Sequence, residues 1–398
     1  MSTLRVNTLQ NTSTTDGGIS IDNSGHVTID GQVLPSAGPL SNRNLIINGA
    51  MQVAQRGTSA SISDGANEGY RTLDRWITQF SGGAGGVATM SQATEVPNNT
   101  FKYSLKVDVT TADTDVATNH AITFQQRLEG QDIENSGWDY TNSDSYLTLS
   151  FWARSTKAGT YCCWFYNTGP SANYTIVKEY TLAANTWKHV TLSFPGNSNL
   201  NFAVGSNAGL RIGWTLVAGT DRQITADTWQ NVSTKYGTSN QVNFFDSTDN
   251  VWNLTGVQLE VGSVATPFEH RSYGEELALC QRYYQKSYPT EVTPGTNVSA
   301  SLGFAGMEGR TGMSGVSSNG EHFRGTKLFP SMRTTPNVTI YDRVGNAGKI
   351  TGTKYLTADT DNVTGPVQNV CATGFQVKCL NAGDFGGISF HYTADAEL

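Results

Sequence analysis

The chain has 398 residues, of which only 15% are charged, and a formal net charge of −7 at pH 7. An acidic chain without a run of Lys and Arg lacks the attraction on which nucleic-acid binding depends, so we expect no nucleic-acid partner. No stretch approaches the roughly 18 consecutive apolar residues of a membrane span, so we expect a soluble chain made in the cytoplasm, without membrane insertion. The 42 Gly, with abundant Thr and Asn, favour strands and tight turns, so the predicted fold class is all-β.

Residues 1–41 contain short alternating segments separated by turn residues. Ile19 and Ile21 alternate with polar residues, and after a turn Val27 and Ile29 resume the alternation. The segment has too few large apolar residues to close a core. We therefore predict that other copies of the chain or a docking partner stabilise it.

Residues 42–271 carry strand patterns at the spacing of a two-sheet sandwich. Between Tyr146 and Arg154, apolar residues occupy every second position: Leu147, Leu149, Phe151 and Ala153. Similar alternation occurs around Val190, Ile212 and Val257. The pattern predicts an antiparallel jelly-roll sandwich.

Residues 272–288 interrupt the strand patterns. Leu277, Cys280 and Tyr284 have the i, i+3, i+7 spacing of a helix, and acidic residues stand at its start. We predict a short helix at a domain boundary, with an apolar stripe that suits a three-helix bundle on a symmetry axis. Residues 289–398 then return to strands and predict a smaller β-sandwich tip.

Two regions offer candidate receptor-binding residues. A Gly-rich polar stretch, residues 303–325, predicts an exposed loop at the tip. Its charged and hydrogen-bonding side chains are our candidate receptor residues: Glu308, Arg310, Glu321, His322 and Arg324. Trp138 lies in the polar segment NSGWDYTNS, so we expect its ring to face solvent and to stack on a sugar. Each group also has an alternative without receptor binding. The loop side chains would then only interact with water, and Trp138 would pack in the core.

Nothing in the sequence predicts catalysis or a resident cofactor. There is no nucleophile elbow, zinc-protease motif or phosphate-binding loop, and the six His are scattered. Asp246 to Asn250 and Asp359 to Asn362 offer oxygen ligands for a structural Ca²⁺, but neither has the spacing of a known calcium loop, so solvated turns are the default. We expect no catalytic residue and no metal ligand. Two carboxylates are enough for glycoside hydrolysis, so a polysaccharide-cleaving enzyme stays a minority hypothesis.

Five Cys do not suggest a disulfide framework. Cys162 and Cys163 should point to opposite faces of a strand. Cys371 and Cys379 could face each other across a hairpin, as a reduced buried pair.

Several strings resemble one family. They are MSTLRVNTLQN at the start, NLIINGAMQVAQRGTS at 44–59, YRTLDRW at 70–76, LSFWARS at 149–155, the stretch 254–288, and FHYTADAEL at 390–398. In these strings the chain resembles the tail fibre, or receptor-binding, proteins of tailed bacteriophages, especially those of marine and cyanobacterial phages. Its middle region also resembles carbohydrate-binding jelly rolls.

The resemblance implies an elongated, homotrimeric virion protein of the phage tail, made in the host cytoplasm. Residues 1–41 would attach to the tail, baseplate or an adaptor protein, and the distal domains would bind host surface polysaccharide, lipopolysaccharide above all, without cleaving it. Two rival hypotheses stay open: a polysaccharide depolymerase tailspike, and a purely structural tail or head appendage.

Overall fold

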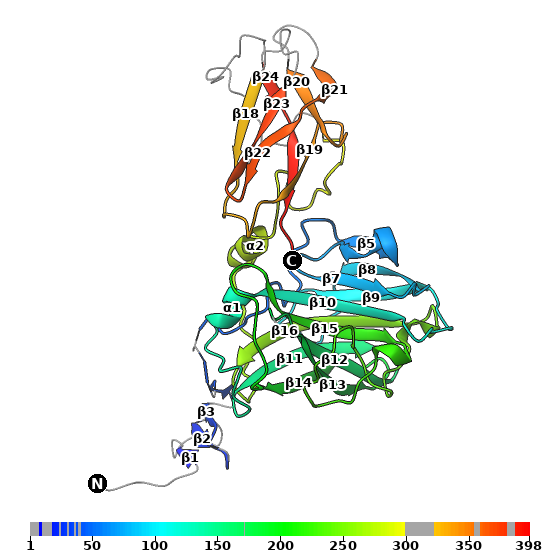
Figure 1. The fold of residues 1–398 in the computed structure, drawn as a ribbon, viewed down its shortest axis with the longest axis vertical. Helices are drawn as coiled ribbons and strands as arrows, with labels where there is room; N and C mark the ends of the chain where they lie inside the picture. Colours follow the sequence, from blue (N-terminus) through cyan, green and yellow to red (C-terminus); the bar gives the residue numbers. More distant parts are fainter. Residues whose placement is uncertain are drawn as a thin grey trace, which may run out of the picture.

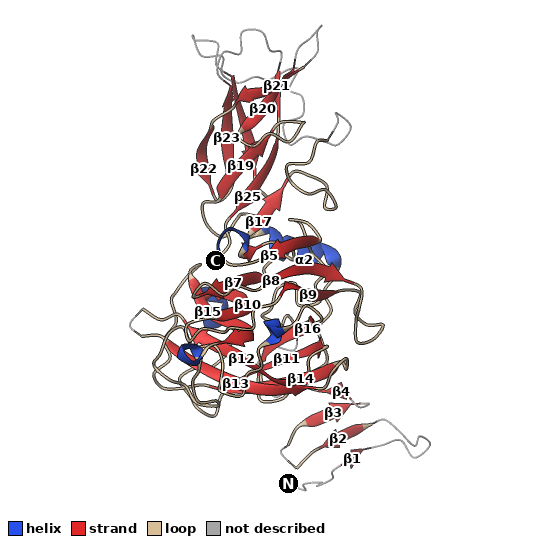
Figure 2. Cartoon of the chain, turned by 90° about the vertical axis from the view of Figure 1, so that its right-hand side faces the viewer, coloured by secondary structure: helices blue, strands red, loops and turns tan. Residues whose placement is uncertain are grey.

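The computed structural model describes residues 8–9, 18–23, 25–29, 32–35, 37–38, 41–170, 172–298, 322–353, 359–379 and 387–398. These form three β units along one long axis (Figure 1). A small N-terminal sheet stands at one end, a large sandwich lies in the middle, and a slender tip stands at the other end, an order that is also clear from the side (Figure 2). No helix in this described part is long and apolar enough to cross a membrane.

The N-terminal unit is a four-stranded antiparallel sheet in chain order. Its strands are β1 (Thr8–Leu9), β2 (Ile19–Ile21), β3 (Val27–Ile29) and β4 (Gln32–Val33). Its large apolar side chains are exposed, among them Leu9 at 55% and Ile21 at 43%. None of its described residues belongs to a hydrophobic core cluster. As the sequence predicts, this segment does not close a core by itself.

The middle unit is the predicted sandwich, made of two six-stranded antiparallel sheets. One has the order β13-β12-β15-β10-β7-β6 and the other β14-β11-β16-β9-β8-β5. Their strands in chain order are β5 (Ser59–Ile62), β6 (Gly69–Tyr70), β7 (Ile77–Ser81), β8 (Val87–Ala93), β9 (Ser104–Thr111), β10 (Ala121–Glu129), β11 (Tyr146–Ser155), β12 (Gly159–Asn167), β13 (Tyr174–Leu182), β14 (Lys188–Pro195), β15 (Ala208–Ala218) and β16 (Val251–Val261).

The core between the sheets follows from the alternation in the sequence. All four alternate residues of β11, from Leu147 to Ala153, are fully buried. Phe151 meets Trp214 of the facing sheet edge-on, with ring centres 5.6 Å apart. Full burial of one such side chain contributes about 1.5–3 kcal/mol, so these residues fix which face of each strand turns inward. The all-β prediction is confirmed.

Helices are short and stand at the edges of the sandwich. α1 (Gly130–Glu134) follows β10, and three single 3₁₀ turns lie at Gly65–Asn67, Thr220–Arg222 and Phe244–Asp246. α2 (Tyr273–Gln281) begins at a capping box, in which the Ser272 hydroxyl accepts from the Glu275 amide and the Glu275 carboxylate accepts from the Ser272 amide.

The predicted helix of 272–288 is therefore too long at its end. Tyr284 lies in β17 (Tyr284–Lys286), which pairs with the tip strand β25 (His391–Asp395). Tyr284 is buried there and cannot extend an apolar stripe of α2. Pairing with a strand distant in sequence outweighs a local helical pattern.

The tip contains three three-stranded sheets around a small core. Their orders are β17-β25-β19, β18-β23-β22 and β21-β20-β24. Besides β17 and β25, the strands of the tip are β18 (His322–Lys327), β19 (Asn337–Tyr341), β20 (Lys349–Thr353), β21 (Thr360–Thr364), β22 (Val367–Cys371), β23 (Gly374–Cys379) and β24 (Gly387–Ser389). Ile340, Ile350, Phe375 and Phe390 are buried at its centre.

The segment Asp395–Leu398 leaves the tip and lies against the sandwich. Arg75 pairs with Glu397, Arg56 contacts Asp395 at 3.0 Å, and Nη1 of the tip residue Arg333 donates to the Ser206 carbonyl at 2.6 Å. These contacts join the tip to the sandwich through charge-assisted hydrogen bonds.

No disulfide bond joins any of the five cysteines, all of which are described. Cys163 packs in the main core and Cys162 in a cluster on the opposite face of β12, as predicted. The predicted facing pair Cys371 and Cys379 is wrong, because Cys371 stands opposite Gly374 at a hairpin end and is exposed, while Cys379 is buried.

Candidate functional site

The five candidate residues of the tip loop fall into two groups. Glu308, Arg310 and Glu321 lie outside the described residues. His322 and Arg324 belong to β18, whose backbone pairs with Cys379 and Val377 of β23, but their side chains lie outside the described part. Receptor binding by this group stays a prediction.

The expectation that Trp138 faces solvent is wrong. Its side chain is 4% exposed and belongs to the main core. The ring lies 6.1 Å from that of Tyr140 and 5.9 Å from that of Phe202. The polar residues around Trp138 form a loop that closes over the ring, so burial of a large aromatic side chain prevails over the polarity of its neighbours.

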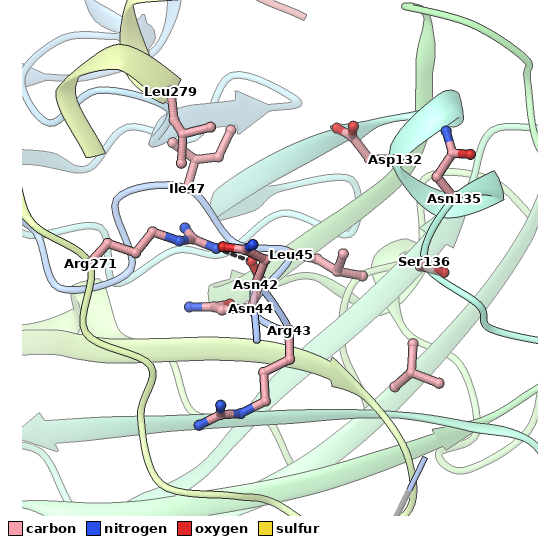
Figure 3. Close-up of a pocket in the computed structure, with 11 residues that line it drawn as sticks. Asn42, Arg43, Asn44, Leu45, Ile47, Asp132, Asn135, Ser136, Arg271 and Leu279 are labelled. Carbon is pink, nitrogen blue, oxygen red and sulfur yellow. Dashed lines mark hydrogen bonds between the residues drawn. The ribbon is translucent and has the colours of Figure 1, made fainter. Parts of the chain in front are cut away.

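A pocket of about 260 Å³ lies between the segment Asn42–Ile47, α1 and α2 (Figure 3). A second pocket, of about 630 Å³, shares Asn42, Arg271 and Leu279 with it and extends along α2. We call the two together the junction pockets. Figure 3 shows the Arg271 side chain reaching the backbone of Asn44.

The charged groups of the junction pockets are bound to the protein itself. Arg43 lies 3.6 Å from Glu260 and 3.8 Å from Glu269. Arg271 lies 3.6 Å from Glu276 and donates to the Ile46 carbonyl at 2.9 Å. No Trp, Tyr or Phe of the described residues lines either pocket. The charged residues that line the pockets therefore join segments of the chain to one another. A sugar ring would find no Trp, Tyr or Phe side chain there on which to stack.

The outer face of the sheet that contains β12, β15 and β10 is a different kind of surface. Tyr166 pairs with Arg211, and Arg211 pairs with Arg127, so three side chains form a row across neighbouring strands. The Arg211 guanidinium lies 5.4 Å from the centre of the Tyr166 ring. With Tyr70 on the edge strand β6 and two residues of the covering loop, these side chains form what we call the tyrosine–arginine face: Tyr70, Arg127, Tyr166, Arg211, Arg222 and Tyr236.

The floor of this face is fixed by a glycine. A Cβ on Gly213 would lie 2.1 Å from the ring of Trp164, so only glycine lets the indole lie over β15. Tyr236 covers the indole at 5.0 Å between ring centres. Its backbone amide donates to the Arg222 carbonyl at 2.8 Å, which ties the loop residues to each other.

Several polar atoms of the face and of neighbouring residues on the same strands have no hydrogen-bond partner among the described residues. They are the Nε atoms of Arg127 and Arg211, Nε1 of Trp164 and Oε1 of Gln125. Arg127 donates through Nη1 to the Leu398 oxygen at 2.6 Å. Buried polar groups are normally satisfied, so a cluster of unsatisfied ones indicates places where water or a ligand binds.

The ionisable groups of the face act on one another. Burial lowers the pKa of Arg127, and the charge of Arg211 adds to that effect. Burial raises the pKa of Tyr236, and the charges of Arg222, Arg211 and Arg127 oppose the rise. At neutral pH the face thus presents neutral phenols beside cationic guanidiniums. Phenol rings stack on the apolar faces of sugars, and guanidinium and amide groups bind their oxygens.

The face cannot be found from the sequence because its members come from five separate segments: β6, β10, β12, β15 and the covering loop. Cys162, Trp164 and Tyr166 alternate on β12, but only the register with β15 sets Tyr166 beside Arg211. One usable signal is Gly213 in the interior of the strand Ala208–Ala218, because glycine inside a strand often marks the close approach of another group.

The segments with candidate Ca²⁺ ligands are used in ion pairs. Lys157 Nζ lies 2.5 Å from Asp246, and Arg343 contacts Asp359 at 3.1 Å and Asp361 at 2.9 Å. Within the described ranges no group of three or more His, Cys, Asp or Glu is arranged to hold a metal ion.

No protein-family model matches the sequence, and no curated protein matches it either. Among solved structures, the enzymatically active domain of bacteriophage CBA120 tailspike protein 4 is similar at 12% identity and a TM-score of 0.30, over 55% of this chain and 21% of that chain. A family 11 carbohydrate-binding module of a Clostridium thermocellum cellulosomal cellulase is similar at 14% identity and a TM-score of 0.26, over 54% of this chain and 100% of that chain. The module TmCBM61 in complex with β-1,4-galactotriose is similar at 10% identity and a TM-score of 0.25, over 55% and 98% of the two chains. Similarity at these TM-scores carries no argument about function.

Proposed function

We propose that the chain binds a polysaccharide on the tyrosine–arginine face and does not cleave it. The observation that carries the proposal is the row of Tyr166, Arg211 and Arg127, where an aromatic ring stands beside guanidinium groups. A sugar ring stacked on Tyr166 would bring its hydroxyl groups to the Arg211 guanidinium beside that ring.

We also propose a role for the whole chain, as a homotrimeric subunit of a phage tail fibre in the virion. The fibre would attach the particle to host surface polysaccharide, with lipopolysaccharide as the main candidate. The elongated arrangement supports it, as do the exposed apolar side chains of the N-terminal unit: Leu9, Ile19, Ile21, Ile29 and Leu34. Those side chains would be covered by other copies of the chain or by the tail protein that receives residues 1–41. Three modest sugar sites on one axis would act together at high effective concentration.

The direct test measures binding of the purified chain to a panel of bacterial lipopolysaccharides and capsular polysaccharides. We expect at least one to bind, and Tyr166→Ala to weaken that binding by about tenfold through loss of stacking. Trp152→Ala is the matched control, because Trp152 is a half-buried aromatic residue on β11 of the other sheet, beside His189. Failure of every polysaccharide to bind, or equal effects of the two substitutions, would contradict the proposal.

Two further measurements separate the rivals. Release of oligosaccharides from a bound polysaccharide during long incubation would favour a depolymerase over a binding protein. Light scattering should give the mass of three chains, whereas a monomer would contradict the fibre proposal. A trimer that binds no envelope polysaccharide would favour the structural appendage.

A further inference from the structure

The charge balance on the tyrosine–arginine face is opposite to that of the whole chain. The chain carries a net charge of −7. Six of the twelve arginines whose side chains are described are close to a carboxylate: Arg43, Arg56, Arg75, Arg271, Arg282 and Arg343. Arg211 and Arg222 form no ion pair with any described acidic residue. Two cations on one face of an acidic protein therefore lack counter-charges among the described residues.

Both arginines are held in place by contacts that leave their charge uncompensated. Arg211 extends along the Tyr166 ring at 5.4 Å. Arg222 donates through Nε to the Asn119 carbonyl at 2.8 Å and through Nη1 to that of Thr234 at 3.4 Å. Carbonyl groups orient a guanidinium without neutralising it, so the sites are preorganised for an anion.

Three acidic groups of neighbouring segments have partners of their own. Glu179 accepts hydrogen bonds from Thr238 and Asn240. Asp221 accepts from the Thr118 hydroxyl at 2.6 Å. Glu397 pairs with Arg75 and Arg56 at the domain junction.

We propose that the ligand of this face is an anionic polysaccharide, whose carboxylate or phosphate group binds Arg211 and Arg222 while a neighbouring sugar ring stacks on Tyr166 or Tyr236. The inference rests on the proposed function and narrows its substrate class. Guanidinium groups bind carboxylate and phosphate through paired hydrogen bonds, and such contacts are about twice as strong as those to a neutral hydroxyl. A neutral glucan would leave both charges without a partner.

The test compares polysaccharides that differ only in charge. One arm uses polygalacturonate and its methyl ester, and the other uses a phosphorylated mannan before and after removal of phosphate. We expect the full-length chain to bind the charged member of at least one pair about tenfold more tightly at low salt, with the difference shrinking as salt rises. The arm that shows the preference identifies the anionic group.

Substitution then assigns the preference to the face. Arg211→Gln should abolish the tenfold preference, because it should weaken binding of the charged member much more than binding of the neutral member. The control Arg154→Gln changes a half-buried arginine on β11 that contacts Asn185, and it should keep the preference. Tyr166→Ala should weaken binding of both members.

The outcomes distinguish the two proposals. Equal binding of charged and neutral members by the unaltered chain overturns the anionic ligand but leaves polysaccharide binding intact. An equal loss of preference in both arginine variants also overturns it, because the effect would then come from overall charge. If neither these polysaccharides nor the bacterial panel binds, the proposed function itself fails.

Discussion

Asp74 illustrates how burial determines the behaviour of a single residue. It is fully buried, and the Gln55 amide donates to it at 3.0 Å. Its cationic neighbour Arg56 lies 3.8 Å away through Nη1, an atom without a hydrogen-bond partner among the described residues. Desolvation therefore outweighs the pairing and raises the pKa of Asp74 to about 6.

The raised pKa predicts a pH-dependent stability difference. Between the ordinary aspartate pKa of 3.8 and about 6 the folded chain binds the Asp74 proton more tightly than the unfolded chain, so this residue contributes more stability as pH falls through that window. Asp74→Asn removes that gain. Relative to the unaltered chain, the variant should lose up to about 3 kcal/mol in free energy of unfolding between pH 7 and pH 4, measured by urea denaturation. Parallel pH profiles would contradict the assignment.

His391 in the tip should act in the opposite direction. It is buried and stacked on Tyr288 at 4.0 Å, and burial lowers its pKa to about 4. Below the ordinary value of 6.5 the unfolded chain takes up the proton first, so the tip should lose stability as pH falls from 6.5 toward 4. His391→Gln should flatten that dependence in thermal unfolding followed at the tip. An unchanged slope would mean that other groups cause the acid sensitivity.

At the scale of elements, the contact between β12 and β15 depends on Gly213. Gly213→Ala would force Trp164 out of its place under Tyr236, so we expect a loss of about 1–3 kcal/mol in stability together with weaker polysaccharide binding. Gly325→Ala on β18 is the matched control, because a Cβ there meets no atom within 4 Å. Denaturation and binding curves of both variants check the expectation. Equal stability of the two variants would show that the Trp164 ring can move at little cost.

Secondary-structure elements could be predicted from the sequence where the pattern that defines them is local. Period-two alternation identified β11, β15 and β16 because one face of each strand is buried along its whole length. The end of α2 could not be placed, since it depends on the pairing of β17 with β25. The orientation of Trp138 depends on Phe202, which is distant in sequence. The tyrosine–arginine face likewise arises from strand register and a covering loop, which composition and spacing do not encode.

At the scale of the whole molecule, the buried ion pairs of Glu397 join the tip to the sandwich. Its side chain is 6% exposed and that of Arg75 is 1% exposed. Glu397→Gln leaves Arg75 without its carboxylate, so we expect a loss of about 3 kcal/mol or more. The exposed pair of Lys178 and Asp227 offers a control, and Asp227→Asn should cost no more than about 1 kcal/mol. Calorimetry should also show the tip and sandwich transitions separating in the first variant only. Equal losses in the two variants would place the strength of the junction in other contacts.

The pairing of β17 with β25 brings the chain's entry into the tip and its exit from it to the same end of the tip. A module with both connections side by side can be exchanged as a unit, much as a domain inserted into a loop can be. The boundary of such an exchange would lie within these two strands. A replacement tip must keep the Asp395–Leu398 segment, because this segment contacts three arginines of the sandwich: Arg56, Arg75 and Arg127. The fold thus permits a new tip on an unchanged sandwich through recombination at two adjacent points.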